Sequence, residues 1–224
     1  MKPTYIGHRQ RIKDKYKKSG IKGWLDYEVL ELILSYAIAR KDTKPIAKKL
    51  MVRFKTINGV LDADSKELQT VSGISEHTTV FLKLLKDIAV LYLENGLHSK
   101  DLLSSSEAVF DYLKASLKGC TDEKFRSLFL NSRNQLIAGE TLQTGTVNRS
   151  VVYPRKIVER ALHHHAVGII IAHNHPAGIL TPSKEDCAVT KAIKDALKTV
   201  DVALLDHIII GGNDYFSFNK KGLL

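Results

Sequence analysis

The stretch "IIIAHNHPAGILTPSKEDCAV", residues 169–189, joins an apolar run to a polar turn and then to the start of a helical pattern. The run "AVGIIIAH", residues 166–173, is short, continuous and rich in β-branched residues, as expected of a strand buried on both faces. The following "SKEDCAVTKAIKDALKTV", residues 183–200, has helical spacing. The stretch therefore predicts a buried strand, a turn and a helix, in an α/β fold.

Two histidines stand where this strand ends. His173 and His175 are two positions apart, so in an extended segment both imidazoles point to the same side. Ser183 follows after seven intervening residues and Asp186 three positions later, so both lie in the first turn if the helix begins there. Two imidazoles and a carboxylate with an open fourth position are typical of a catalytic zinc site. Ser183 and Asp186 also fit the S-x-x-D/E capping pattern, and the two roles are compatible.

The residues around this stretch predict a mixed β-sheet with flanking helices. "FRSLFLN" and "QLIAGETLQ" alternate as strands do, with the turn "SRN" between them. "YPRKIVERALHHH" has helical spacing, with Pro154 at its start. "VALLDHIIIGG" and "YFSF" complete the pattern as strands. This module is expected to occupy residues 102–224.

The first part of the chain has helical patterns only. We expect helices in residues 25–41 and 43–54. "DSKELQTVSGISEHTTVFLKLLKDIAVLYLENG" predicts a short helix, a tight turn at Gly73 and a long amphipathic helix that ends at Gly96. These elements predict a small all-helical module at residues 1–98.

Composition limits the class of protein. The 224 residues are 44% hydrophobic and 26% charged, which is ordinary for a globular protein. No apolar run approaches the roughly 20 residues that span a bilayer, and the N-terminus lacks the apolar core of a signal peptide. Only Cys120 and Cys187 are present, so a disulfide framework is not expected. We expect a cytoplasmic protein without a membrane partner.

The net charge of +10 is unevenly distributed. Residues 1–100 carry +8, from 19 Lys and Arg against 11 Asp and Glu, whereas residues 101–224 carry +2. Residues 1–22 alone hold eight basic side chains and one acid, Asp14. Such a segment can attract a phosphate backbone, or it can be the solvated face of a helix. Both interpretations stay open.

The order and spacing of the motif residues match a known family. "HNHPAGILTPSKED" resembles the JAMM motif of MPN-domain zinc metalloproteases, His-x-His-(seven residues)-Ser-x-x-Asp. The wider text, from "GTVNRSVVYPRK" to "LLDHIIIGG", resembles the bacterial RadC family in particular. The resemblance covers nearly the whole chain. It implies a C-terminal MPN-type domain of mixed sheet and helices after a helical module.

The resemblance also implies residue roles. His173, His175 and Asp186 would bind one Zn²⁺ ion, and the Ser183 hydroxyl would stabilise an oxyanion. The family uses a glutamate on an earlier strand as general base, and the best match is Glu140 in "LIAGETLQTGTV". Glu159 in "KIVERAL" is the rival, but it suits an ion pair on a helix better. The implied enzyme is a zinc metalloprotease or isopeptidase whose zinc-bound water attacks an amide of a protein or peptide substrate.

Three further features are given structural roles. The run His163 to His165 is expected to end a helix, because consecutive helical residues cannot all bind one ion. Cys187 is expected to pack as a small hydrophobic residue. Arg155 in "YPRK" matches a family motif and is a candidate for orienting a strand end or binding a substrate carboxylate.

A second resemblance concerns the helical module. "LQTVSGISEHTTVFLKLLK" is similar to a helix-hairpin-helix element that keeps Gly73 and Lys83, whereas Ser75 replaces the second glycine of the turn. Such turns bind phosphate through backbone N–H groups, so these three residues are candidate nucleic-acid contacts. The RadC family has carried a DNA-repair label, so a DNA-associated protein is the alternative function. A packing module or a protein-docking module is the remaining interpretation of this region.

The letters "HNH" do not indicate an HNH nuclease. In that class the named residues are spread across a ββα-metal element, whereas here they are adjacent.

Overall fold

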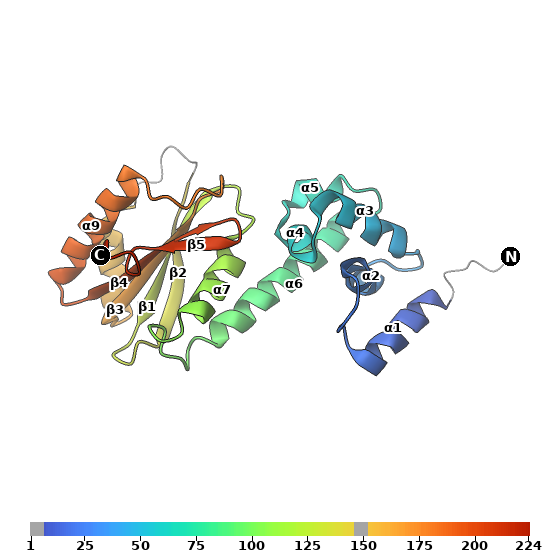
Figure 1. Ribbon diagram of the computed structural model, residues 1–224, viewed down its shortest axis with the longest axis horizontal. Coiled ribbons are helices and arrows are strands. Elements are labelled where there is room, and N and C mark those ends of the chain that lie inside the picture. Colours follow the sequence, from blue (N-terminus) through green and yellow to red (C-terminus); the bar gives the residue numbers. More distant parts are fainter. Residues whose placement is uncertain (1–6, 146–151) are drawn as a thin grey trace. The chain divides into compact units, whose positions relative to one another are not determined.

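The computed structural model describes residues 7–145 and 152–224 (Figure 1). The chain divides into two compact units, Met1–Ile88 and Ala89–Leu224. Part of the segment "GTVNRSVV" and the basic residue Lys2 lie outside the described residues. None of the described helices combines the length and apolarity that crossing a bilayer requires.

The first unit is helical, as predicted. Buried apolar side chains form one core, in which Leu30, Leu34, Leu50, Leu68 and Leu82 are fully buried. Two of its helices were not separately predicted. The helices are α1 (His8–Ser19), α2 (Asp26–Ala37), α3 (Lys44–Phe54), α4 (Ile57–Asp62), α5 (Ser65–Gln69) and the first part of α6 (Glu76–Asn95); α1 and α4 are the additional two.

The boundary between the units lies inside α6 at Ile88, not in the polar segment near residue 100 where the composition placed it. The last turns of α6 explain the difference. Val90 and Leu93 pack against the same apolar cluster as the buried Leu97 and Leu102, and that cluster belongs to the second unit. One continuous helix therefore supplies side chains to two cores.

The second unit contains a five-stranded mixed sheet, as predicted. The strands are β1 (Glu123–Leu130), β2 (Leu136–Gly145), β3 (Gly168–Asn174), β4 (Ala203–Gly211) and β5 (Asp214–Ser217). Their order is β2-β1-β3-β4-β5, with β3 and β4 parallel and the other neighbours antiparallel. The parallel pair is connected through α9 (Lys184–Lys198), so the turn after β3 leads directly into a helix.

Helices cover both faces of this sheet, and Figure 1 shows α7 (Ser106–Leu117) and α9 on opposite sides. Alternate residues of β3 serve the two faces. Ile170 and Ala172 join the cluster that contains α7, whereas Ile169 and Ile171 join the cluster of α9 and α8 (Pro154–His163). His173 continues the second series, so the strand period carries its imidazole to the end of the α8 and α9 face.

Candidate metal centre

The turn after β3 is held against the end of β4. The His175 backbone N–H donates to the Ile210 carbonyl (2.9 Å). Gly178 has a φ of 77°, which favours glycine. A Cβ at Gly211 would lie 2.8 Å from the Gly178 oxygen, so only glycine lets the two segments approach this closely. This packing gives the His175 side chain a defined position.

The hydrogen bond of the His175 ring determines which nitrogen carries the proton. Nδ1 of His175 lies 2.5 Å from the Ile179 carbonyl oxygen. A carbonyl only accepts, so Nδ1 is the donor. In the neutral ring, Nε2 therefore has an unprotonated lone pair.

A chain of three hydrogen bonds does the same for His173. The Thr190 hydroxyl donates to the Asp186 carbonyl (2.5 Å), so it must accept from Nδ1 of His207 (2.6 Å). His207 is fully buried, and burial holds its pKa well below the ordinary value, so the ring is neutral. Its Nε2 then accepts from Nδ1 of His173 (2.9 Å). Nε2 of His173 consequently has a lone pair as well.

The two Nε2 atoms and one carboxylate converge. Nε2 of His173 lies 2.9 Å from Nε2 of His175 and 3.1 Å from Oδ1 of Asp186. The other carboxylate oxygen of Asp186, Oδ2, lies 3.5 Å from Nε2 of His175. Ligand atoms around a tetrahedral zinc ion with bonds of about 2.0–2.1 Å are separated by about 3.3 Å. Two facing lone pairs repel unless a positive charge lies between them, so the donor set fits a metal cation.

The electrostatics of these groups agree with that fit. The hydrogen bond to Asp186 raises the pKa of His175, although burial opposes the shift. Burial by itself would raise the pKa of Asp186, but His173 and His175 outweigh it and hold that pKa well below its usual range. The site thus keeps its carboxylate ionised and attracts positive charge.

Ser183 and Asp186 form the capping box that the spacing predicts. The Ser183 hydroxyl accepts from the Asp186 backbone N–H (3.0 Å), and Oδ2 of Asp186 accepts from the Ser183 backbone N–H (2.7 Å). The hydroxyl also donates to Oδ2 (2.7 Å). The cap aims the carboxylate at the histidines, so capping and metal binding are compatible. Oxyanion stabilisation by Ser183 stays a prediction.

A glutamate that sequence reasoning did not select lies at this site. Among the residues that the structure describes, Glu123, His173 and His175 each offer a ligand atom within 4.8 Å of the other two. Oε1 of Glu123 is 3.8 Å from Nε2 of His173 and 3.9 Å from Nε2 of His175. These distances exceed direct hydrogen bonds, so the carboxylate lies beside the two histidines without binding either ring.

Glu140, the expected general base, occupies a different place. Nε of Arg160 donates to its Oε2 (2.7 Å), Nη2 of Arg160 to Oε1 (2.5 Å), and Nε2 of His164 to Oε1 (2.7 Å). The Arg160 and His164 hydrogen bonds lower the pKa of Glu140 to about 2, against a smaller opposing effect of burial. A carboxylate held this way is a poor proton acceptor, so Glu123 replaces Glu140 as the candidate base.

The strand order explains the difference between the two glutamates. β1 is the direct neighbour of β3, with Phe125 opposite His173, so Glu123 stands two residues from that pair. Glu140 is on β2, the edge strand, about 9–10 Å from β3 across two strand spacings. Sequence alternation placed Glu140 on a strand and began the preceding strand only at Phe125, two residues after Glu123, and it does not say which strand lies beside the histidines.

The remaining candidates have structural positions. Helix α8 ends at His163, as predicted, and His165 has a φ of 51° beyond that end. The Arg155 guanidinium lies over the Tyr153 ring, 5.3 Å from its centre. Cys187 is exposed, which corrects the expectation that it packs as a hydrophobic residue.

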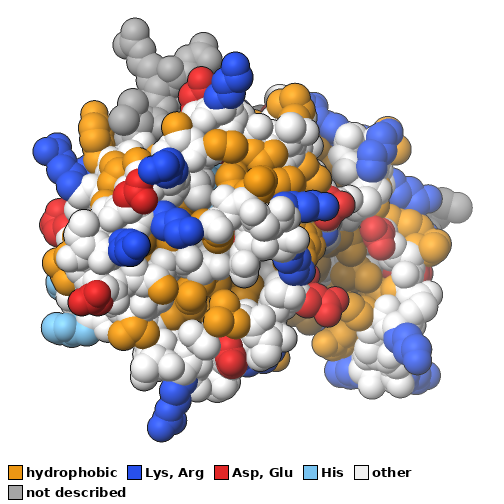
Figure 2. Space-filling view, turned by 60° about the vertical axis from the view of Figure 1, so that its left-hand side comes forward, with side chains coloured by type: hydrophobic (Ala, Val, Ile, Leu, Met, Phe, Trp, Pro, Cys, Tyr) orange, Lys and Arg blue, Asp and Glu red, His pale blue; other side chains and the backbone are white. Residues whose placement is uncertain are grey.

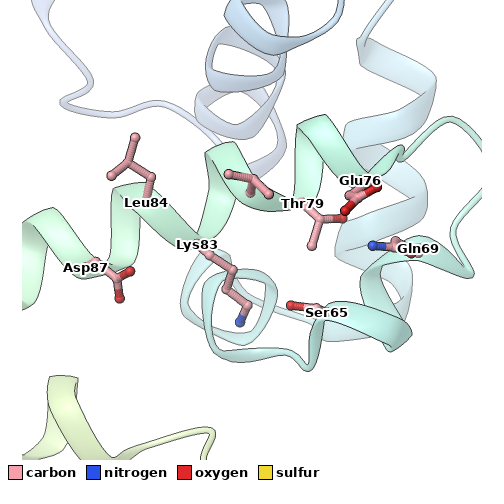
Figure 3. Close-up of a pocket in the computed structure, with 8 residues that line it drawn as sticks. Ser65, Gln69, Glu76, Thr79, Lys83, Leu84 and Asp87 are labelled. Atoms are coloured by element: carbon pink, nitrogen blue, oxygen red, sulfur yellow. The ribbon is translucent and has the colours of Figure 1, made fainter.

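The three candidate nucleic-acid contacts have partners within the helical unit. The Lys83 ammonium donates to the Leu61 (2.9 Å) and Ala63 carbonyls, and burial lowers its pKa. Figure 3 shows the Lys83 side chain reaching from α6 to the neighbourhood of Ser65. The Ser75 hydroxyl accepts from the Thr78 N–H (3.3 Å), as an N-cap of α6 does. Gly73 has a φ of 102° and packs on Ile46. The Lys83 ammonium is therefore already hydrogen-bonded to two backbone carbonyls, and DNA contact stays a prediction.

We expect Glu140→Gln to lower the stability of the fold without changing metal binding. The folded-state pKa of Glu140, about 2, is below the ordinary 4.5, so its ionised form stabilises the fold above pH 4.5. That contribution is lost as the pH falls from 4.5 toward 2. Urea unfolding should show the largest difference between wild type and variant at pH 7, shrinking toward pH 3.

Glu159→Gln is the matched control, because Glu159 is an exposed glutamate on α8. It should change the urea midpoint much less than Glu140→Gln does. Equal stability of Glu140→Gln and wild type at pH 7, or loss of bound metal in Glu140→Gln, would contradict the structural assignment.

We expect Thr190→Val to weaken zinc binding by about tenfold and His207→Ala by about 10- to 100-fold. Valine keeps the volume of threonine but cannot accept from Nδ1 of His207, so the proton arrangement of His173 is no longer enforced. Competition with a chromophoric chelator measures both affinities. Wild-type affinity in both variants would show that the hydrogen-bond chain does not prepare His173.

Comparison with known proteins agrees with this site. The sequence pattern of the RadC-like JAB domain matches residues 103–223, which contain the sheet and every residue of the metal centre. UPF0758 protein FN0909 of Fusobacterium nucleatum subsp. nucleatum is 40% identical over 225 aligned residues, covering 97% of this chain and 97% of that protein. The similarity thus extends through the helical unit, and the chain belongs to the RadC family.

Proposed function

We propose that the protein is a zinc-dependent hydrolase that cleaves a peptide or isopeptide amide. One observation carries the proposal: two imidazole lone pairs and the Asp186 carboxylate meet within 2.9–3.5 Å, beside a glutamate that none of them binds directly. The arrangement provides three ligands and an adjacent base. That combination is typical of a catalytic site and not of a closed structural one.

The ligand set supports zinc. Imidazole nitrogen with a carboxylate oxygen suits zinc, whereas magnesium and calcium prefer oxygen donors alone. His173, His175 and Asp186 would hold the ion. When bound, such an ion acidifies a water molecule and polarises a substrate carbonyl.

The protein's own residues would carry the proton. Glu123 would accept a proton from the attacking water as the oxygen bonds to the carbonyl carbon. The same carboxyl group would then deliver that proton to the amide nitrogen while the carbon–nitrogen bond breaks. The immediate products are a carboxylic acid and an amine, and transfer of the remaining acid proton to the amine gives a carboxylate and an ammonium ion, so atoms and charge balance.

Ser183 would assist at the carbonyl oxygen. Its hydroxyl now donates to Oδ2 of Asp186, which a bound cation would draw toward itself. The proton of Ser183 would then be able to turn toward the oxygen that gains negative charge, a role that is worth several kcal/mol in other hydrolases.

A protein or peptide in the cytoplasm is the substrate class that we propose. The side chains of Glu123 and His175 keep 21% and 17% of their surface exposed. The base and the outer histidine thus face solvent, where an extended chain can reach them. Both cysteines are free, which agrees with a reducing compartment.

The test measures the bound metal and the cleavage of substrate separately. The purified protein should hold about one zinc ion per chain, and His173→Ala and Asp186→Ala should lose it. Glu123→Gln should keep the ion and lose hydrolysis. Element analysis measures the metal, and comparison of new protein N-termini in cells carrying wild type or Glu123→Gln measures cleavage.

The exposed His163 on α8 provides the control, because His163→Ala should keep both zinc and cleavage. Full zinc occupancy in His173→Ala and Asp186→Ala would refute the metal site. Identical N-terminal profiles for wild type and Glu123→Gln would refute the hydrolase.

A second candidate is DNA binding by the helical unit. Two lysines of α1 lie over aromatic rings, the half-buried Lys13 over Tyr36 (4.7 Å) and the exposed Lys15 over Trp24 (4.6 Å). Basic and aromatic side chains together suit nucleic acid. On the face that Figure 2 shows, which is mainly that of the second unit, Lys and Arg are dispersed among apolar, neutral and acidic side chains. The charge of residues 1–22 is thus the main support for this candidate.

If the helical unit binds DNA, the affinity of the full chain for duplex DNA should fall linearly with the logarithm of salt concentration. Lys13→Ala with Lys15→Ala should weaken binding and reduce that slope. Lys191→Ala with Lys194→Ala, on α9, should leave both unchanged. Absence of binding at 20 mM salt, roughly the regime where phosphate contacts are strongest, would exclude this candidate.

A further inference from the structure

Asn174, between the two histidines, is only 4% exposed. It belongs to β3 and continues the pairing with β4, opposite Ile210. On its other side the ladder between β1 and β3 stops one residue earlier, at Phe125 and His173. The next rung would place Lys124 opposite Asn174.

The side-chain amide of Asn174 takes the place of that rung. Its Oδ1 accepts from the Lys124 backbone N–H (2.8 Å), and its Nδ2 donates to the Asp122 carbonyl (3.1 Å). Nδ2 also lies 3.5 Å from the Cys120 carbonyl. A primary amide offers one acceptor and a donor, as a peptide group does, so it can extend a ladder where the backbones separate.

The two backbone groups that Asn174 binds flank a single residue, Glu123. On the opposite side, the backbone of Glu123 pairs with Gly145 of β2. The start of β1 is thus fixed from both neighbours. The Glu123 carboxylate thus stays 3.8–3.9 Å from the Nε2 atoms of His173 and His175.

We infer that Asn174 is a positioning residue, whose amide holds the backbone on both sides of Glu123 and thereby places the general base beside the metal ligands. The inference rests on the proposed function. Consecutive strand residues point to opposite faces, so Asn174 acts on the base and not as a ligand. The sequence His173-Asn174-His175 then provides two metal ligands and, between them, the residue that positions Glu123.

The test uses the full-length chain loaded with Co²⁺, whose visible spectrum changes with pH when a proton is lost at the ion. The Glu123 carboxylate disfavours that loss, so Glu123→Gln should lower the pH midpoint. Asn174→Ala should lower it in the same direction and by at least half as much. In the Glu123→Gln background, Asn174→Ala should add nothing, because it acts through Glu123.

Asn174→Asp is the matched variant, since aspartate has nearly the same volume and keeps the acceptor for Lys124. Its carboxylate cannot donate to the Asp122 carbonyl, so this hydrogen bond is lost without creating a cavity. Both Asn174 variants should bind about one Co²⁺ per chain. Amide hydrogen exchange at Lys124 should accelerate by about tenfold or more in Asn174→Ala.

The outcomes separate the two proposals. A wild-type chain that binds no Co²⁺ overturns the proposed function and this inference with it. A midpoint that moves in Glu123→Gln but not in Asn174→Ala overturns the role of Asn174 alone. An additive effect in the double variant also overturns it, because Asn174 would then act independently of Glu123.

Discussion

The metal centre depends on one constraint, namely that two imidazoles are hydrogen-bonded so that their lone pairs face each other. The Ile179 carbonyl fixes the proton of His175, and the Thr190 hydroxyl, through His207, fixes that of His173. The Nε2 atoms of the two histidines are then 2.9 Å apart, with the Asp186 carboxylate beside them. Such an arrangement is unfavourable without a cation, so binding of a metal ion would increase the stability of the fold.

Three elements of the second unit supply this constraint, namely β3, β4 and α9. β3 carries the histidines, and β4 supplies both His207 and, through the close approach at Gly211, the wall for the turn. α9 supplies Asp186 and Thr190 on one side of its first turns, because residues four apart share a helix face. The parallel pair β3 and β4 and the helix that connects them thus form the smallest part of the fold that can build the site.

The sequence allowed the ligands to be predicted because His173, His175, Ser183 and Asp186 lie within one strand, turn and helix, where local period decides geometry. The same holds for α5, the turn at Gly73 and α6. The sequence did not reveal the roles of Glu123 and His207, because those roles depend on which strands are neighbours. Glu140 was chosen because the resemblance implies a glutamate on an earlier strand, and the edge position of β2 moves it away from the histidines. The compact units meet at Ile88 and not near residue 98, because α6 is continuous and its apolar residues serve two cores.

X-ray absorption at the zinc edge of the loaded protein identifies the atoms that bind the ion. Zinc held by His173, His175 and Asp186 should show two imidazole nitrogens and light oxygen or nitrogen neighbours, at about 2.0–2.2 Å. His207→Ala should disorder one imidazole contribution. A sulfur neighbour at about 2.3 Å, or a single imidazole in the wild type, would contradict the site built from His173, His175 and Asp186.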